Sequence, residues 1–188
     1  MRSIELVLLE SQRRQNISIN LALDATRMKP LIRAIKYLDK LVELNLASNK
    51  LDDTCTTELC DSLKTLGNLR VLNLSNNRLT SKSIKVLETM APEANGGMLP
   101  SLKSLDLSFN LLGDASVSSI IDFCRRQLVS LEEINLSCCL LTSRSWLENE
   151  EPWEYLMKER PTLKSIYLTH NHIEIHSKRQ YSAHVVVS

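Results

Sequence analysis

Three of the four histidines fall close together near the C-terminal end of the chain and could bind a metal. His170, His172 and His176 lie within seven residues, and imidazole is a common zinc ligand. Asn171, between the first two, occupies a repeated position described below, so the simpler interpretation places both flanking histidines on the surface of a turn. A metal-dependent enzyme using these histidines remains an alternative hypothesis, whereas the preferred prediction has no metal site.

Other residues with chemical potential lack the spacing of a reactive site. The four glycines form neither a phosphate-binding loop nor a dinucleotide fingerprint, and no serine, histidine and aspartate set suggests a nucleophile. The five cysteines are an odd set without zinc-ligand spacing, and Cys55, Cys60 and Cys124 fall at apolar positions of predicted helices. We therefore expect reduced core thiols, and a protein that is not an enzyme and needs no cofactor.

Composition excludes several classes of protein. The net charge is +1, with 24% charged and 43% hydrophobic residues, so the chain lacks the basic excess that sequence-independent nucleic-acid binding requires. No stretch of about 18 apolar residues is present, and the short apolar segment from Ile4 to Leu9 is interrupted by Glu5. We expect an intracellular protein that binds neither nucleic acid directly nor a membrane.

The elements that carry these residues follow a repeated pattern, L-x-x-L-x-L-x-x-N-x-L. Leu41 to Leu51 is one close copy, and similar copies start at Leu69, Leu102 and Leu163. A fifth copy has cysteine at the asparagine position, and a weaker first copy has threonine there. This is the signature of leucine-rich repeats, and the predicted structural ladder is Thr26, Asn49, Asn77, Asn110, Cys139 and Asn171.

The distance between successive ladder positions predicts the architecture. It runs from 23 residues, between Thr26 and Asn49, to 33, between Asn77 and Asn110. This period leaves room for a helix after each short strand, as in repeats of the ribonuclease-inhibitor type. The prediction is an α/β solenoid of about six repeats, a horseshoe segment with a concave parallel sheet and helices on its convex side.

The repeats also predict boundaries. We expect an N-terminal cap at 1–16, a leucine-rich-repeat domain at 17–174, and a C-terminal tail at 175–188 whose valines either extend the sheet as an edge strand or stay loose. Two inserts disturb the period: a surface loop at 91–99, and an irregular segment at 143–154 with Trp146 and Trp153. Each insert either tolerates extra length or binds a partner, and the tryptophans either pack inside or anchor that partner.

Because side chains alternate along a strand, the outward positions of the sheet can be identified from the pattern. Among 24 such positions there is no Lys or Arg, and there are four acids, one of them Asp24. We predict a mildly negative concave face that binds a basic segment of a partner protein, although small polar residues can simply keep an exposed sheet soluble. The predicted contact residues are Glu43, Asn45, Asn73, Asp106, Phe109, Glu133, Asn135, Tyr167 and His170.

The order of irregular features adds a more specific resemblance. The segment from Leu21 to Ile35, the Asn49-Lys50-Leu51-Asp52 turn, the insert before Leu102 and the Leu112-Gly113-Asp114 turn resemble the C-terminal repeat block of Tonsoku-like proteins, over residues 17–174. That family has further tetratricopeptide and ankyrin repeats, which this sequence lacks. The resemblance implies a nuclear scaffold that works with a large partner subunit at stalled or broken replication forks. The alternative is a cytosolic repeat protein that regulates a ribonuclease or a small GTPase.

Overall fold

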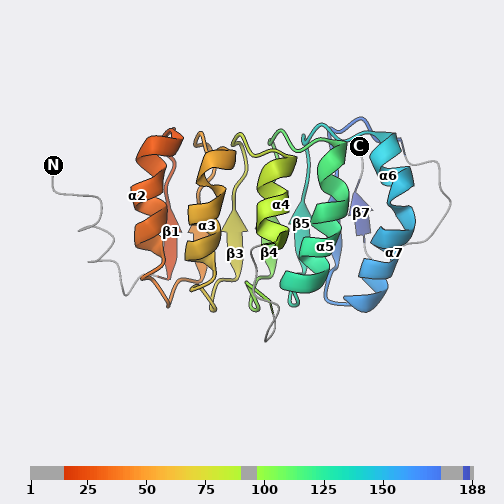
Figure 1. Ribbon diagram of the computed structural model, residues 1–188. Helices are drawn as coiled ribbons and strands as arrows, with labels where there is room; N and C mark the ends of the chain where they lie inside the picture. The colour runs from red at the N-terminus through yellow and green to blue at the C-terminus, as the bar shows by residue number, and fades with distance from the viewer. Residues whose placement is uncertain (1–14, 90–96, 175–183, 187–188) are drawn as a thin grey trace.

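The structure is a computed structural model that describes residues 15–89, 97–174 and 184–186. Its strands stack in chain order into one seven-stranded parallel sheet, and the helices cover one side of that sheet (Figure 1). The predicted α/β solenoid with a parallel sheet is therefore confirmed. The strands are β1 (Asn16–Ser18), β2 (Glu43–Asn45), β3 (Val71–Asn73), β4 (Ser104–Asp106), β5 (Glu133–Asn135), β6 (Ser165–Tyr167) and β7 (His184–Val186).

Each strand is followed by a helix wherever the chain between two strands is fully described. The helices bury the apolar side chains that recur every three or four residues, such as Leu59 and Leu63, against the sheet. The α-helices are α2 (Ala25–Ile35), α3 (Thr56–Leu63), α4 (Ser81–Thr89), α5 (Val117–Gln127), α6 (Ser143–Glu148) and α7 (Glu150–Glu159), and 3₁₀ turns η1 (Asp53–Cys55) and η2 (Asp114–Ser116) precede α3 and α5.

The sheet register aligns the central residue of every strand. Leu44 pairs with Leu72, Leu72 with Leu105, and so on along the sheet, and these side chains are almost completely buried. Their neighbours in each strand point to the opposite side of the sheet. The hydrophobic core thus lies between the sheet and the helices. Among the described residues, no helix is long and apolar enough to cross a bilayer.

The first repeat begins earlier than the sequence pattern indicated. Strand β1 is centred on Ile17, which pairs with Leu44, and the predicted ladder residue Thr26 instead lies exposed within α2. The assignment of Thr26 to the ladder is therefore wrong. The reason is local: Asp24 accepts a hydrogen bond from the Arg27 backbone N–H at 3.0 Å and caps α2. Asp24 is therefore the N-cap of a helix and not, as predicted, an outward residue of a strand.

The C-terminal end adds a strand that the predicted boundary at 174 left out. Strand β7 pairs in parallel with β6, with Val185 opposite Ile166. Of the two alternatives for the terminal valines, the edge strand is confirmed. The predicted tail therefore contributes to the sheet, while residues 1–14 of the predicted N-terminal cap lie outside the described part of the structure.

The two inserts have different characters. Residues 91–96 lie outside the described residues, but Met98 and Leu99, at the end of that insert, are buried in the core. The second insert is helical and forms α6 and the start of α7. Trp146 and Trp153 are 3% and 1% exposed and stack with ring centroids 6.0 Å apart, so both tryptophans pack inside rather than anchor a partner.

Candidate protein-binding surfaces

The asparagines of the repeat join neighbouring coils through their side-chain amides. The Asn77 Nδ2 donates to the carbonyl oxygens of Leu46 and Leu74, both at 3.0 Å, and its Oδ1 accepts from the Leu51 backbone N–H at 3.0 Å. Asn49, Asn110 and Asn171 make the same kinds of contact. A short amide with both donors and an acceptor is what this turn needs, because buried backbone groups require partners.

Cys139 occupies the same register position but makes fewer bonds. Its thiol donates to the Leu107 carbonyl oxygen, with Sγ and O 3.2 Å apart, whereas the Asn171 side chain accepts from the Cys139 backbone N–H at 2.9 Å. Burial raises the pKa of the Cys139 thiol to about 12, so the sulfur stays protonated and unreactive in the folded protein. The coil of Cys139 is therefore joined to the coil before it by a thiol hydrogen bond, where the other coils have a side-chain amide.

A second bridge between coils was not predicted from the sequence. The Asp53 carboxylate accepts from the Thr80 backbone N–H at 3.1 Å, from the Thr80 hydroxyl at 2.8 Å, and from Ser83 Oγ. Asp114 does the same for Thr142. Burial would raise the pKa of Asp53, but the hydrogen bonds from Ser83 and Thr80 hold it below its ordinary value. The sequence does carry a signal for this bridge: an aspartate lies four residues after one ladder position, and a threonine lies three residues after the next ladder position.

Four of the predicted contact residues bond to their own turns on the open sheet face, which is the side of the sheet away from the helices. Each of these side-chain oxygens accepts from the backbone N–H two residues later, at 2.9 to 3.0 Å. This Asx-turn geometry fixes the end of each strand. The four side chains therefore have a structural task, whatever else they contact: Asn45, Asn73, Asp106 and Asn135.

The remaining predicted residues of the open sheet face are more available. Glu43 and Glu133 are exposed and Tyr167 is half-buried, and Glu133 accepts a hydrogen bond from Ser104 Oγ at 2.6 Å. Carboxylates near a half-exposed tyrosine suit a partner with Lys or Arg side chains. These residues belong to β2, β5 and β6, so a partner that contacts all of them must span the sheet.

Charged residues immediately before the strands limit how negative this face is. Glu132 accepts from Lys103 Nζ and from Lys164 Nζ, each at 2.6 Å. These two hydrogen bonds lower the pKa of Glu132 to about 2, so it remains ionised between its lysines. The predicted outward positions did not include this row, in which Arg70 lies immediately before β3.

Two predicted contact residues lie away from the strands, in the turns that follow them. Phe109 and His170 have φ angles of +55° and +56°, in the left-handed region, and both are exposed. This conformation is uncommon for a bulky side chain. Both residues therefore belong to a different surface from Glu43 and Tyr167, at the edge where the strands end.

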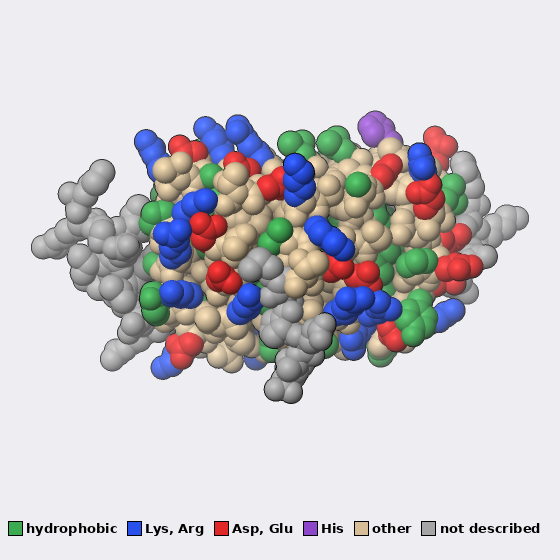
Figure 2. Space-filling model, in the orientation of Figure 1, with side chains coloured by type: hydrophobic (Ala, Val, Ile, Leu, Met, Phe, Trp, Pro, Cys, Tyr) green, Lys and Arg blue, Asp and Glu red, His purple; other side chains and the backbone are tan. Residues whose placement is uncertain are grey.

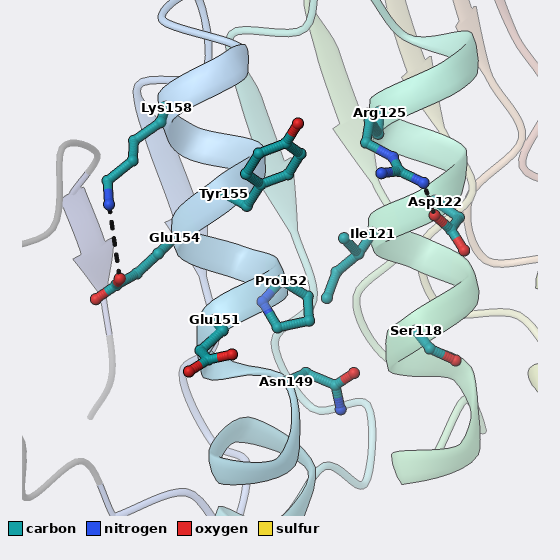
Figure 3. Close-up of a pocket in the computed structure, with 10 residues that line it drawn as sticks. All are labelled: Ser118, Ile121, Asp122, Arg125, Asn149, Glu151, Pro152, Glu154, Tyr155 and Lys158. Atoms are coloured by element: carbon teal, nitrogen blue, oxygen red, sulfur yellow. Dashed lines mark hydrogen bonds and ion pairs between the residues drawn. The ribbon is translucent and has the colours of Figure 1, made fainter.

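A cavity of 670 Å³ opens on the helical side, between α5 and α7 (Figure 3). Tyr155 and Pro152 on α7 face Ile121 and the ion-paired Asp122 and Arg125 on α5. The charges on its walls are of both signs and largely paired within a helix, which gives the cavity no clear preference for a cation or an anion. Among the described residues, no cluster of histidine, cysteine, aspartate and glutamate could hold a metal, and His176 lies outside them.

Comparison with known proteins identifies the class of repeat. Two leucine-rich-repeat family models match the chain, at residues 68–90 and 99–120. Together with the parallel sheet and its helices, they make this chain a leucine-rich-repeat protein. Such repeats generally form non-enzymatic scaffolds that bind other proteins.

More specifically, the chain resembles Tonsoku-like protein. It is 33% identical to that protein from Mus musculus over 152 residues, 81% of this chain, and 28% identical to the one from Danio rerio over 154 residues, 80% of this chain. The Bos taurus protein is 32% identical over 152 residues, again 81% of this chain. The chain spans about a tenth of the length of these curated relatives, 10% to 11%.

A solved structure supports the fold independently. The chain superposes on the structure titled "Leiomodin-1 Actin-Binding Site 2 (ABS2)" with a TM-score of 0.62, covering 86% of this chain and 94% of the other. The two sequences are 15% identical, so the likeness concerns the arrangement of the coils alone.

Proposed function

We propose that this chain is a non-catalytic protein-interaction scaffold of nuclear replication-fork and recombinational DNA repair, and that it acts together with a larger protein subunit. The observation that carries this proposal is the resemblance to Tonsoku-like protein, which extends over 152 residues, 81% of this chain, at 33% identity. The role in repair is what that resemblance implies. The boundaries proposed for the repeat unit, 17–174, need extension to β1 and β7.

The open sheet face supplies the proposed contact with a basic segment of the partner. Glu43 and Glu133 present carboxylates, and Tyr167 offers an aromatic ring with a hydroxyl. Phe109 and His170 were predicted as further contacts of the same segment, but they lie at the adjoining edge and are left out of this contact. Asp106 is a poor choice for mutation, because its carboxylate accepts hydrogen bonds from the backbone N–H and the hydroxyl of Ser108. A change there would alter the turn as well as the charge.

Affinity capture tests this proposal with three baits: the wild-type chain, a Glu43→Lys/Glu133→Lys variant, and an Asp39→Lys/Asp61→Lys variant. Asp39 and Asp61 are exposed acids away from the open sheet face, so the third bait controls for the change in net charge. Proteins retained from nuclear and cytosolic extracts are identified by mass spectrometry. We expect replication-fork or chromatin proteins on the wild-type and control baits and much less on the Glu43→Lys/Glu133→Lys bait.

Other outcomes contradict the proposal in different ways. Recovery of a cytosolic ribonuclease or small GTPase without nuclear proteins would favour the regulator alternative. Nuclear proteins retained equally by all three baits would keep the repair setting and reject the open sheet face as the contact surface. Recovery of nothing from nuclear extract would reject both parts.

A further inference from the structure

The turns after the strands carry two rows of outward residues on either side of the buried ladder. One row immediately precedes the ladder position and the other immediately follows it. We call these ten residues the rim: Ser48, Asn76, Phe109, Cys138 and His170 in the first row, and Lys50, Arg78, Leu111, Leu140 and His172 in the second. All five residues of the first row have a left-handed backbone, with φ between +51° and +57°, so their side chains are presented in the same way.

The middle of the rim is apolar and exposed. Phe109, Leu111 and Leu140 are 57%, 54% and 56% exposed, although each is large enough to contribute to a core. Their coils are direct neighbours. The Phe109 backbone N–H donates to the Ser137 carbonyl oxygen, and the Gly113 backbone N–H donates to the Cys139 carbonyl oxygen, each at 2.9 Å. The three side chains and the half-buried Cys138 therefore form a contiguous patch. A contiguous exposed apolar patch beside polar neighbours is a candidate interaction site.

The first coils of the rim are basic instead. Lys50 and Arg78 occupy the positions that Leu111 and Leu140 occupy later, and both are exposed. Within the described ranges, neither has an ion-pair partner. Figure 2 shows this change along the upper edge of the molecule, where Lys and Arg side chains on the left give way to hydrophobic ones and then to a histidine.

We infer that the rim is a docking site for a short segment of a partner protein that carries large apolar side chains next to carboxylates. This inference rests on the proposed function as a scaffold and adds a second contact of opposite charge preference. The apolar side chains of the segment would cover Phe109, Leu111 and Leu140, and its carboxylates would lie over Arg78 and Lys50. Burial of apolar anchors supplies the affinity, and the charges fix the direction of the segment.

The charge distribution selects this occupant over others. A basic segment is repelled by Lys50 and Arg78, and it has the acidic groups of the open sheet face to bind instead. Neighbouring strands lie about 4.8 Å apart and an extended chain advances about 3.3 Å per residue, so the distance from Lys50 to Leu140 corresponds to about five residues. A short linear segment is therefore sufficient.

Selection from a library of random 12-residue peptides displayed on phage tests the inference, with the purified chain as the immobilised target. We expect the enriched peptides to combine large apolar residues with aspartate or glutamate. The affinity of the strongest peptide is then measured by fluorescence anisotropy. Leu111→Ser/Leu140→Ser should weaken binding about tenfold or more, and Arg78→Glu about threefold to tenfold, with the wild-type affinity falling as salt is raised.

Matched controls separate the rim from general stickiness. Tyr37 and Leu147 are 62% and 65% exposed and lie outside the rim, so Tyr37→Ser/Leu147→Ser removes exposed apolar surface elsewhere. Lys40→Glu is the corresponding control for Arg78→Glu, since Lys40 is exposed on the connection before β2. Both controls should bind the peptide as the wild type does. Basic consensus peptides, no enrichment, or equal losses in the controls would overturn the inference.

The capture experiment distinguishes this inference from the proposed function. If the Leu111→Ser/Leu140→Ser bait still retains the nuclear proteins and the peptide selection fails, the rim is not a docking site but the scaffold role stands. If the rim binds acidic, apolar peptides and the wild-type bait recovers no nuclear protein, the docking site stands and its setting is different. Circular dichroism of each variant confirms that it remains folded.

Discussion

The buried ladder and the second row of the rim lie one residue apart along the chain, yet they differ in almost every property. Asn49, Asn77 and Asn110 are nearly identical in their surroundings and bond to backbone groups of two coils. The residues that follow them, Lys50 and Arg78 among them, are exposed and change in type from coil to coil. Backbone geometry dictates the ladder, whereas the rim is free to vary, and recognition by a partner can use that freedom.

The largest expected loss of stability follows a substitution in the ladder that leaves the rim unchanged. Asn77→Ala leaves buried carbonyl oxygens and a backbone N–H without partners, which should lower the free energy of unfolding by about 3 kcal/mol. Arg78→Ala, one residue later, should change it by less than about 0.5 kcal/mol. Urea denaturation followed by circular dichroism measures both. Similar losses in the two variants would show that the two rows are not energetically distinct.

Removing the charge of Asp53, which bridges two coils, should have a smaller effect on stability. The hydrogen bonds to its carboxylate lower its pKa below 3.8, so their contribution is complete above about that pH and is lost as the pH falls through the folded-state pKa. Asp53→Asn should cost about 1.5 kcal/mol at pH 7 and make stability less dependent on pH in the acidic range below about pH 4. Urea denaturation at pH 7, 4 and 3 tests this.

Asp61→Asn serves as the control for that experiment, because Asp61 is exposed and its ion pair in the described part of the chain is the surface pair with Lys64. Its stability should follow that of the wild type at every pH. If Asp53→Asn and the wild type lose stability in parallel as the pH falls, the carboxylate of Asp53 does not carry the charge-dependent bridge between the two coils.

A third change concerns the one described ladder position that is not asparagine. Cys139→Ala removes a thiol hydrogen bond and a sulfur atom from the core, and should cost about 1 kcal/mol. This is clearly less than the cost of Asn77→Ala, because an amide makes more bonds than a thiol. Thermal unfolding of the two variants side by side gives the ranking, and a larger loss for Cys139→Ala would reverse it.

The smallest expected effect lies in the rim and has the opposite sign. Leu140 has a φ of +60°, which strains a leucine but is tolerated by asparagine. Leu140→Asn should therefore raise the free energy of unfolding by about 0.5 kcal/mol while weakening binding of the rim peptide. Thermal unfolding and anisotropy together test this opposition, which Leu147→Asn, on α6, should not show.

The sequence predicted the ladder and the strands well where each copy of the repeat had every leucine. Around Leu44, Leu72 and Leu105, the apolar residues and the asparagine are fixed by burial and by backbone bonding, so their types leave a clear pattern. The first copy failed because Leu21 and Leu23 resemble a strand, whereas the Asp24 cap and the apolar stripe of α2 decide the structure there. Local hydrogen bonding overrode the spacing.

The candidate surfaces were harder to predict than the fold. Whether Asn45 contacts a partner or its own turn depends on backbone conformation, which the residue type alone does not reveal. Leu111 and Leu140 fall at unspecified positions of the pattern, so only their exposure in the structure identifies them as an apolar patch. In contrast, Glu43 and Glu133 were identified from strand alternation, and both are indeed exposed.

The thiol at Cys139 also gives the molecule a built-in reporter of its own opening. In the closed state the sulfur is buried and protonated, with its pKa raised to about 12, and alkylating reagents need a solvated thiolate. Labelling of this atom can proceed only when two adjacent coils separate. Its rate therefore measures how often the solenoid parts at this joint, and a partner that spans the joint should slow that chemistry without touching the sulfur.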